Sequence, residues 1–166
     1  MDFGDGFGRR RTIPMEFDEL YPLPEQLPGL RRLGFSITMD PATNVVCALI
    51  MPALRVTGPR PRAVHFFSRL MSWTNRTFAR PPYGCVVTLE AQGVWAGARR
   101  ALTARIFHQD AYDLTAISGA SMAGQLLDGS VRSPGVHRMG LVVDPDRLLQ
   151  DLADMGAHVS CSPASG

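Results

Sequence analysis

The spacing of apolar and polar positions around residue 120 predicts a capped helix followed by a strand. Apolar residues recur at helical spacing over residues 114–127, and the carboxylates of Asp110 and Asp113 stand where the first free backbone N–H groups need acceptors. Gly129 follows at a position that favours a left-handed helix end. Residues 135–143 are rich in valine and leucine, and this pattern predicts a strand.

A second helix and strand are expected directly downstream. Asp144 and Pro145 indicate the helix start, because proline at the first helical position loses no hydrogen bond. The apolar stripe of this helix consists of Leu148, Leu149, Leu152 and Met155. Gly156 ends the helix, and residues 158–161 predict the closing strand. Residues 110–161 therefore predict helix, strand, helix and strand in that order.

Four strands are expected upstream of this region. Residues 9–17 and 34–39 predict short strands, while residues 83–93 and 98–108 predict longer ones rich in β-forming residues. We expect the two longer strands to pair antiparallel across residues 94–97, with charges on one face and the core on the other.

Glycines at positions 4, 6 and 8 form a GxGxG string near the start of the chain. A dinucleotide-binding loop of this kind follows a full strand and opens a helix, whereas here only three residues come before it. The pair Asp5-Gly6 is favoured in tight hairpins. We therefore interpret the string as a hairpin turn.

The remaining segments predict two helices and one extended connector. An aspartate–proline pair at residues 40–41 precedes an apolar run at 45–54, which predicts a helix with a break near Pro52. Residues 62–78 predict an amphipathic helix. Three prolines between residues 21 and 29 predict an extended connector.

This order of elements is typical of the α+β class. We expect a mixed, mostly antiparallel sheet with helices packed against it, in a single domain that spans residues 1–166. A strand–GxGxxG–helix unit is not found in the sequence, so no Rossmann domain is expected in this chain.

Composition excludes several classes of function. The chain has 45% hydrophobic and 19% charged residues, as ordinary globular proteins do. Apart from histidine, every basic side chain is arginine, and a net charge of only +2 argues against a nucleic-acid surface. The apolar run at residues 45–54 is half of the roughly 20 residues that a membrane span needs. Because no secretory signal opens the sequence, we expect a cytoplasmic protein without a membrane partner.

Strong catalytic or metal-binding signatures are missing. The sequence contains no GxSxG, HExxH or Walker motif. The cysteines form no CxxC pair, which argues against zinc and against a disulfide framework; they are Cys47, Cys85 and Cys161. The histidines are scattered without ligand spacing, so no metal site is expected; they are His65, His108, His137 and His158.

The helix predicted at residues 114–127 has an unusual surface of small side chains. These residues are Ala116, Gly119, Ala120, Ser121, Ala123 and Gly124. Glycine inside a helix costs roughly 0.5–1 kcal/mol relative to alanine, so a compensating close contact is expected. Packing on the protein's own sheet is the leading interpretation, and a dimer contact or a pocket wall are the alternatives.

Four segments together resemble the C-terminal part of saccharopine dehydrogenase-like oxidoreductases. They are Asp110-Ala-Tyr-Asp-Leu-Thr-Ala116, Gln125-Leu-Leu-Asp-Gly129, Ser133-Pro-Gly-Val136 and Asp144-Pro-Asp-Arg-Leu-Leu followed by Leu152 and Met155-Gly156. The Asp5-Gly6 turn and the connector Leu23-Pro…Leu27-Pro-Gly-Leu30 also resemble the second domain of that family, so the resemblance covers most of the chain. It consists of packing and turn residues. It implies a part of an NAD(P)-dependent oxidoreductase that supplies substrate contacts and dimerisation.

In that family the dinucleotide is bound by a Rossmann domain, which would come to this chain in cis or in trans. The chain by itself is expected to bind no cofactor and to be inactive alone. A carboxylate-bearing small-molecule substrate would need arginine, which makes Arg105 and Arg138, both on expected strands, candidate substrate-binding residues. Tyr83 and His137 are candidate donors or acids. None of the family's catalytic residues can be assigned to a position here.

The alternative hypothesis is a non-enzymatic module that keeps the sheet but not the chemistry. Such a module would form a homodimer or bind a small molecule in an apolar pocket. The dimer version predicts that the small-residue helix or an apolar sheet face is covered by a second copy.

Overall fold

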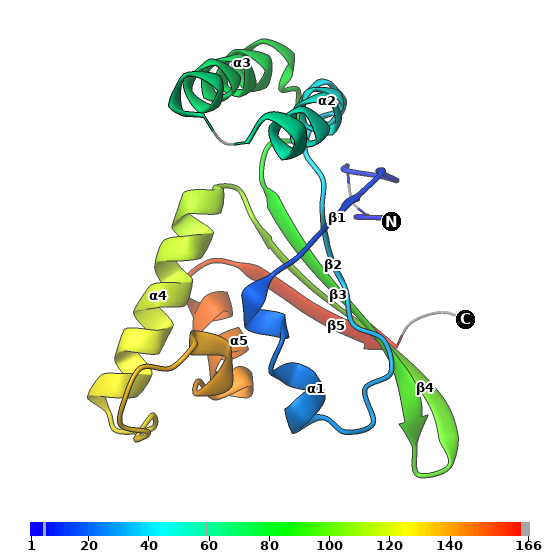
Figure 1. Cartoon of the computed structure of the whole chain (residues 1–166). Helices are drawn as coiled ribbons and strands as arrows, with labels where there is room; N and C mark the ends of the chain where they lie inside the picture. The colour runs from blue at the N-terminus through cyan, green and yellow to red at the C-terminus, as the bar shows by residue number, and fades with distance from the viewer. Residues whose placement is uncertain (5, 59, 164–166) are drawn as a thin grey trace. The chain divides into compact units, whose positions relative to one another are not determined.

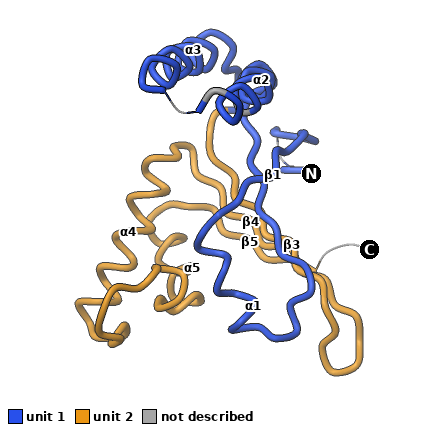
Figure 2. Tube along the Cα trace, viewed as in Figure 1, with its two compact units in different colours: residues 1–82 blue, residues 83–166 orange. Residues whose placement is uncertain are grey.

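The computed structural model describes residues 1–4, 6–58 and 60–163, and its chain divides into two compact units (Figures 1 and 2). Unit 1 is Met1–Pro82 and unit 2 is Tyr83–Gly166. Helices and antiparallel strands occur in both the first and the second unit, which confirms the α+β class. That the chain forms a single domain stays a prediction, and each unit is described by itself.

Unit 1 begins with two antiparallel pairings. Asp2 bridges Arg9, and the backbone N–H of Phe7 donates to the carbonyl of Gly4 at 3.0 Å, as in a tight turn. The predicted Asp5-Gly6 turn involves Asp5, which lies outside the described residues. Strand β1 (Ile13–Met15) then pairs with β2 (Phe35–Ile37), so both expected strands are present but shorter than the sequence pattern indicated.

The connector between β1 and β2 is not extended, and this expectation was wrong. It forms a 3-10 turn, η1 (Asp18–Leu20), and a short helix, α1 (Leu23–Gln26). The backbone N–H of Leu27 donates to the carbonyl of Leu23 at 2.8 Å. Pro22 and Pro24 are compatible with α1 because they stand at its N-cap and in its first turn, where a helix does not use the missing N–H. Pro28 lies in the turn that follows, in which the N–H of Leu30 donates to the carbonyl of Leu27 at 2.8 Å.

Helices α2 (Pro41–Thr57) and α3 (Pro61–Phe78) form the rest of unit 1 and pack against each other. The Asp40 carboxylate caps α2 by accepting the N–H of Thr43 at 3.0 Å. The expected break near Pro52 does not occur, since α2 continues through it to Thr57. An internal proline removes one backbone bond, but the helix-forming residues after it continue the helix.

Unit 2 is built on a three-stranded antiparallel sheet in the order β3-β4-β5. Strand β3 (Cys85–Trp95) pairs with β4 (Ala98–His108) at every position, and β5 (His158–Pro163) pairs with the other side of β4. The two-residue turn at Ala96-Gly97 has positive φ at both positions, which matches the twist of the flanking strands. The expected antiparallel pair is confirmed, with a shorter turn than residues 94–97.

Helices α4 (Ala111–Leu127) and α5 (Pro145–Asp154) are confirmed where the sequence predicted them. The strand expected at residues 135–143 is absent and is replaced by coil and a 3-10 turn, η2 (Met139–Leu141). Backbone bonding there is local, as in the N–H of Val142 to the carbonyl of Met139 at 3.1 Å. Both edges of β4 are already paired, so this segment cannot join next to the central strand.

The core of unit 2 lies between one face of the sheet and the helix pair α4–α5, which lie side by side in Figure 1. Its most buried apolar residues are Leu114, Leu152 and Ala157, and the half-buried residues packed on them are Cys85, Ile106, Ile117, Leu148 and Val159. Burial raises the pKa of the Cys85 thiol. Residues that alternate with these on the strands point to the opposite side, which we call the outer face.

Polar contacts join α4 to α5. The side chain of Gln125 is completely buried; its Oε1 accepts the N–H of Asp144 at 2.8 Å, and its Nε2 donates to the Asp144 carbonyl at 3.4 Å. One turn earlier, the buried Ser121 hydroxyl donates to Asp151 Oδ2 at 2.6 Å. We call these contacts the α4–α5 lock.

The small residues of α4 do not pack on their own sheet, so the leading interpretation of them was wrong. Ala116, Gly119, Ala120 and Ala123 are exposed, and a Cβ added to Gly119 would meet no heavy atom of the described protein within 4 Å. Only Ser121 on this list faces inward and is buried. The core side of α4 is instead formed by Leu114, Ser121 and Gln125.

Replacing Gln125 by leucine is expected to lower the free energy of unfolding by about 2 kcal/mol. The apolar side chain removes the acceptor of the Asp144 N–H and one of the two donors to its C=O, which keeps the N–H of Leu148 at 2.9 Å, a loss of about 1–3 kcal/mol. Urea unfolding followed by circular dichroism measures it. As a control, Gln150→Leu removes an exposed bond to Asp154 and should change stability by less than about 0.5 kcal/mol. Equal effects of both variants would contradict the lock.

The free energy of unfolding should fall at acid pH because of Asp128 in unit 2. Hydrogen bonds from the hydroxyl and N–H of Ser130, together with the Arg147 guanidinium, lower the pKa of the Asp128 carboxyl to about 2. Because this folded-state pKa lies below the unfolded value of about 3.9, the stabilisation is complete above about pH 4 and is lost as pH falls towards 2. Asp128→Asn should therefore be less stable than the parent at pH 6 and equally stable at pH 2 in thermal melts. A difference independent of pH would contradict this.

Candidate functional site

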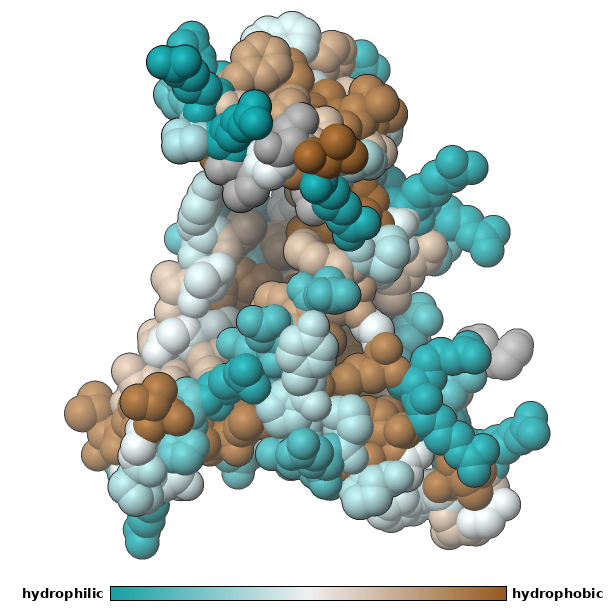
Figure 3. All heavy atoms as spheres, viewed as in Figure 1, coloured by the Kyte–Doolittle hydropathy of each residue, from teal (hydrophilic) through white to brown (hydrophobic). Residues whose placement is uncertain are grey.

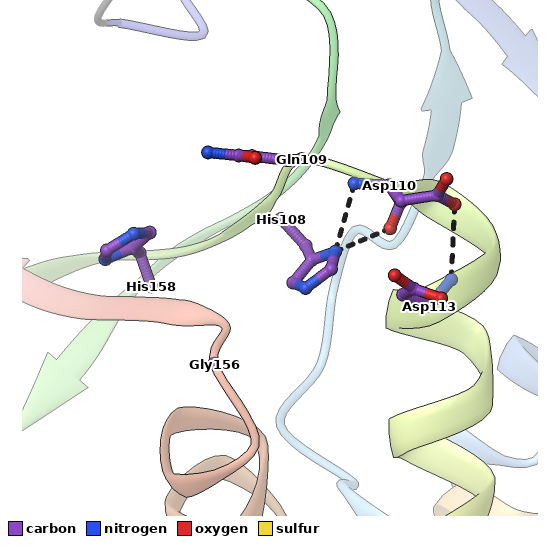
Figure 4. Close-up of a pocket in the computed structure, with 6 residues that line it drawn as sticks. All are labelled: His108, Gln109, Asp110, Asp113, Gly156 and His158. Carbon is purple, nitrogen blue, oxygen red and sulfur yellow. Dashed lines mark hydrogen bonds between the residues drawn. The ribbon is translucent and has the colours of Figure 1, made fainter.

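An open, polar cleft of about 540 Å³ lies in unit 2, where β4 ends and β5 begins (Figure 4). Its lining residues are His108, Gln109, Asp110, Asp113, Gly156 and His158. They come from the end of β4, the first turn of α4 and the start of β5. The cleft therefore sits where three chain segments meet at one end of the sheet.

His108 is held in place by the backbone of Asp110. Its Nδ1 lies 3.0 Å from the N–H of Asp110, which donates to it, and 2.7 Å from the carbonyl oxygen of the same residue. This contact leaves the opposite ring nitrogen, Nε2, pointing away from Asp110 (Figure 4). A histidine with one nitrogen fixed in this way can give or take a proton at the other.

Asp110 and Asp113 have different tasks at the start of α4. Asp110 Oδ1 accepts the N–H of Tyr112 at 2.7 Å and that of Asp113 at 3.3 Å, so Asp110 is the cap that the sequence predicted. The exposed carboxylate of Asp113 adds a negative charge at the same end of the helix. The cleft is therefore a poor place for an anion and suits neutral or cationic groups.

His158 belongs to the outer face of the sheet. Its ring stacks on Phe107, with centroids 5.9 Å apart and planes 19° apart. The chain entering β3 passes close to Phe107: a Cβ on Gly84 would lie 2.6 Å from the Phe107 ring and 2.9 Å from the His108 carbonyl oxygen. Glycine is therefore required at position 84, where φ is +144°.

Arg105 lies on the same outer face, one step along β4 from this stacked pair. Phe107 pairs with His158 and Arg105 pairs with Ser160, and side chains two apart on a strand share a face. Thr88 of β3 flanks Arg105 on its other side. The half-buried Arg105 therefore lies between two hydroxyl residues, Thr88 and Ser160, two positions along β4 from Phe107.

The structure places the other sequence-predicted residues elsewhere in unit 2. Tyr83 is 63% exposed and comes two residues before β3. His137 and Arg138 are exposed in the coil before η2, so the expected strand position of Arg138 was wrong. His137 Nε2 lies 2.9 Å from the carbonyl oxygen of Pro134. Within the described ranges, no side-chain hydrogen bond or ion pair between two of the four candidates is found.

Sequence reasoning missed His108 and His158 as partners in one cleft. They are 50 positions apart in the chain and become neighbours only because β5 pairs with β4 next to its end. A sequence signal was present, since each histidine stands at a predicted strand terminus, and strand ends commonly carry binding residues.

Over residues 1–4, 6–58 and 60–163, the structure contains no group of three histidine, cysteine, aspartate or glutamate side chains placed to hold a metal ion. Nor does that part of the chain contain a helix long and apolar enough to cross a membrane.

Replacing Asp110 by alanine should destabilise the first turn of α4, which lines the cleft, and lower the free energy of unfolding. Loss of the cap exposes the first N–H groups of α4 without an acceptor, at a cost of about 0.5–2 kcal/mol in thermal or urea unfolding. Asp110→Asn retains an acceptor oxygen and should stay within about 0.5 kcal/mol of the parent. If asparagine is as damaging as alanine, the carboxylate has a role other than capping.

Comparison of the chain with protein-family models, with curated proteins and with solved structures finds no match. The resemblance to saccharopine dehydrogenase-like oxidoreductases therefore rests on the sequence segments quoted above. Function has to be argued from the cleft and from the outer face of the sheet.

Proposed function

We propose that the chain is the substrate-facing and dimerisation part of a saccharopine dehydrogenase-like NAD(P)-dependent oxidoreductase. The observation that carries this proposal is the position of Arg105 in the central strand, on the same face as His158, which lines the cleft. A small substrate with a carboxylate would bind there, with its other end towards the cleft, which His158 lines from the outer face and His108 from the helix-covered face.

Arg105 suits a carboxylate for two reasons. Its planar guanidinium donates two parallel hydrogen bonds to a carboxylate, a geometry that lysine cannot reproduce. It is also half-buried between Thr88 and Ser160, where a charge pair is screened less than on an open surface. The acidic cleft repels a second carboxylate, which favours a substrate that carries a neutral or cationic group at its other end.

The histidines supply proton transfer. His108 has its Nδ1 occupied by the Asp110 backbone, so its Nε2 is the atom that holds or releases a proton towards the cleft. His158 is restrained by its stacking on Phe107 and offers a second ring nitrogen nearby. General acid–base catalysis by one positioned imidazole typically contributes about 10²–10⁴-fold to a rate.

A dinucleotide does not fit the starts of three long helices of this chain. Helices α2, α4 and α5 each begin under an aspartate carboxylate that accepts backbone N–H groups, namely Asp40, Asp110 and Asp144. A pyrophosphate needs those donors free and is repelled by the carboxylates. In the proposal, NAD(P) is therefore bound by a Rossmann domain outside this sequence, and this chain binds and orients the substrate.

The second candidate is a non-enzymatic dimerisation or small-molecule-binding module on the same fold. The amount of exposed apolar surface favours dimerisation. Apolar residues lie on the surface of both units (Figure 3), among them Leu49, Val94 and Leu127. Where exposed apolar side chains are contiguous over several hundred Å², they commonly mark an interaction site.

The substrate proposal predicts that succinate, as a dicarboxylate probe, binds the intact chain through Arg105. Titration followed by ¹H–¹⁵N NMR should shift resonances of Arg105, Ser160 and His158, whereas neutral succinamide should not. Arg105→Gln should raise the Kd about 10–100-fold, since a hydrogen bond to a charged group contributes about 1.5–3 kcal/mol.

Arg99→Gln is the matched control for this titration. Arg99 lies on the same strand and the same face, six residues away and fully outside the cleft. It should leave the Kd within about twofold of the parent. Equal weakening by both variants would show that only net charge matters. No binding of succinate at tens of millimolar would contradict the substrate site.

A further inference from the structure

Strand β3 has one long edge with which no strand of the described residues forms a ladder. Each of its eleven residues pairs with β4, and the sheet ends there, because its order is β3-β4-β5. An edge strand presents a row of backbone N–H and C=O groups that can bond another strand. Natural sheets commonly block such edges with proline, lysine, a bulge or a very short strand.

None of these protections is present on β3. Its sequence contains no proline and no basic residue, its register with β4 is continuous, and Glu90 is its one charged residue. The opposite edge of the sheet differs, since β5 has six residues and ends at Pro163. The two edges are therefore unequal, and β3 is the one open to pairing over many residues.

The hairpin turn determines which backbone groups of β3 face outward. A two-residue turn makes its flanking residues, Trp95 and Ala98, a hydrogen-bonded pair, and such pairs then alternate along an antiparallel ladder. The even-numbered residues from Val86 to Val94 consequently direct their N–H and C=O groups away from β4. The groups available to a partner are those of Val86, Thr88, Glu90, Gln92 and Val94.

We propose that the β3 edge binds the β3 edge of a second copy of this chain, antiparallel, so that two three-stranded sheets form one six-stranded sheet. A twofold axis at Leu89 gives a register without like charges. It places Leu89 opposite Leu89, Val87 opposite Ala91, and Thr88 opposite Glu90 of the second copy. In this register the Glu90 carboxylate lies opposite a hydroxyl residue of the second copy and not opposite another carboxylate.

The side chains at this edge also favour a second copy over solvent. Val87 and Leu89 are 46% and 60% exposed, and they would meet their counterparts across the axis. The chain exposes 12812 Å², whereas two separate compact proteins of half its mass would together expose about 9,700 Å². This excess is larger than the roughly 800 Å² that each partner buries in a standard interface.

The pairing closes on itself. Because both copies use the same edge, the β3 edge of each copy is paired in the dimer. Strand β5 of each copy then forms one of the two outer edges of the enlarged sheet. An isologous interface of this kind gives a dimer and not a fibre. It also brings two outer faces, each with its own Arg105, into one continuous surface.

Sedimentation velocity of the full chain at about 1–100 μM tests the proposal. The parent should be a dimer, and Leu89→Lys, which places two ammonium groups together at the axis, should raise the dimer Kd at least about tenfold. Leu102→Lys is the matched control, because Leu102 has the same sheet face and is also exposed, at 45%, but lies on β4. It should change the Kd by no more than about twofold, and circular dichroism should show both variants folded.

A third variant separates the edge from the exposed face of α4. Ala116→Glu adds a charge to that face and should leave the dimer intact. A monomeric parent at 100 μM, assembly beyond the dimer, or dissociation by Ala116→Glu but not by Leu89→Lys would each overturn the proposal. The substrate proposal is tested separately by the succinate titration, because Arg105 does not take part in the β3 pairing.

Discussion

The burial of only one face of the three-stranded sheet is the constraint on which the rest of unit 2 depends. Leu114 and Leu152 cover the strands from the helix side, and Gln125 pairs with the backbone of Asp144 so that α4 and α5 keep their relative position. A polar side chain that is completely buried is tolerated because both of its hydrogen-bonding groups are used. Within unit 2, the helices therefore cover one side of the sheet, and Arg105 and His158 lie on the other.

The outer face and the cleft follow from this arrangement. Capping of α4 by Asp110 brings the end of β4 and the helix start together, and the same residue fixes one nitrogen of His108. Pairing of β5 with β4 then adds His158 beside Phe107 and leaves Arg105 two residues further along that face. The chemistry attributed to the site is therefore a consequence of strand register and of one helix cap.

The local signals in the sequence predicted most of the elements correctly. Caps such as Asp110 and Asp144 act within three residues, so their outcome can be predicted without tertiary information. The strand expected at residues 135–143 was wrong, because the backbone there bonds locally in η2, and a valine- and leucine-rich pattern does not distinguish such a turn from a strand. The cleft was missed for a different reason: His108 and His158 meet only through long-range pairing, which no local pattern encodes.

The α4–α5 lock is the central claim, and native-state hydrogen exchange of the Asp144 amide tests it most directly. Asp144 stands in a connecting segment, where amides normally exchange rapidly. If Gln125 Oε1 binds this N–H in the buried contact described, its opening free energy should match that of the β4 amides, such as Ile106. Exchange of the Asp144 amide at the rate of an exposed loop residue, with Ile106 protected, would contradict the account.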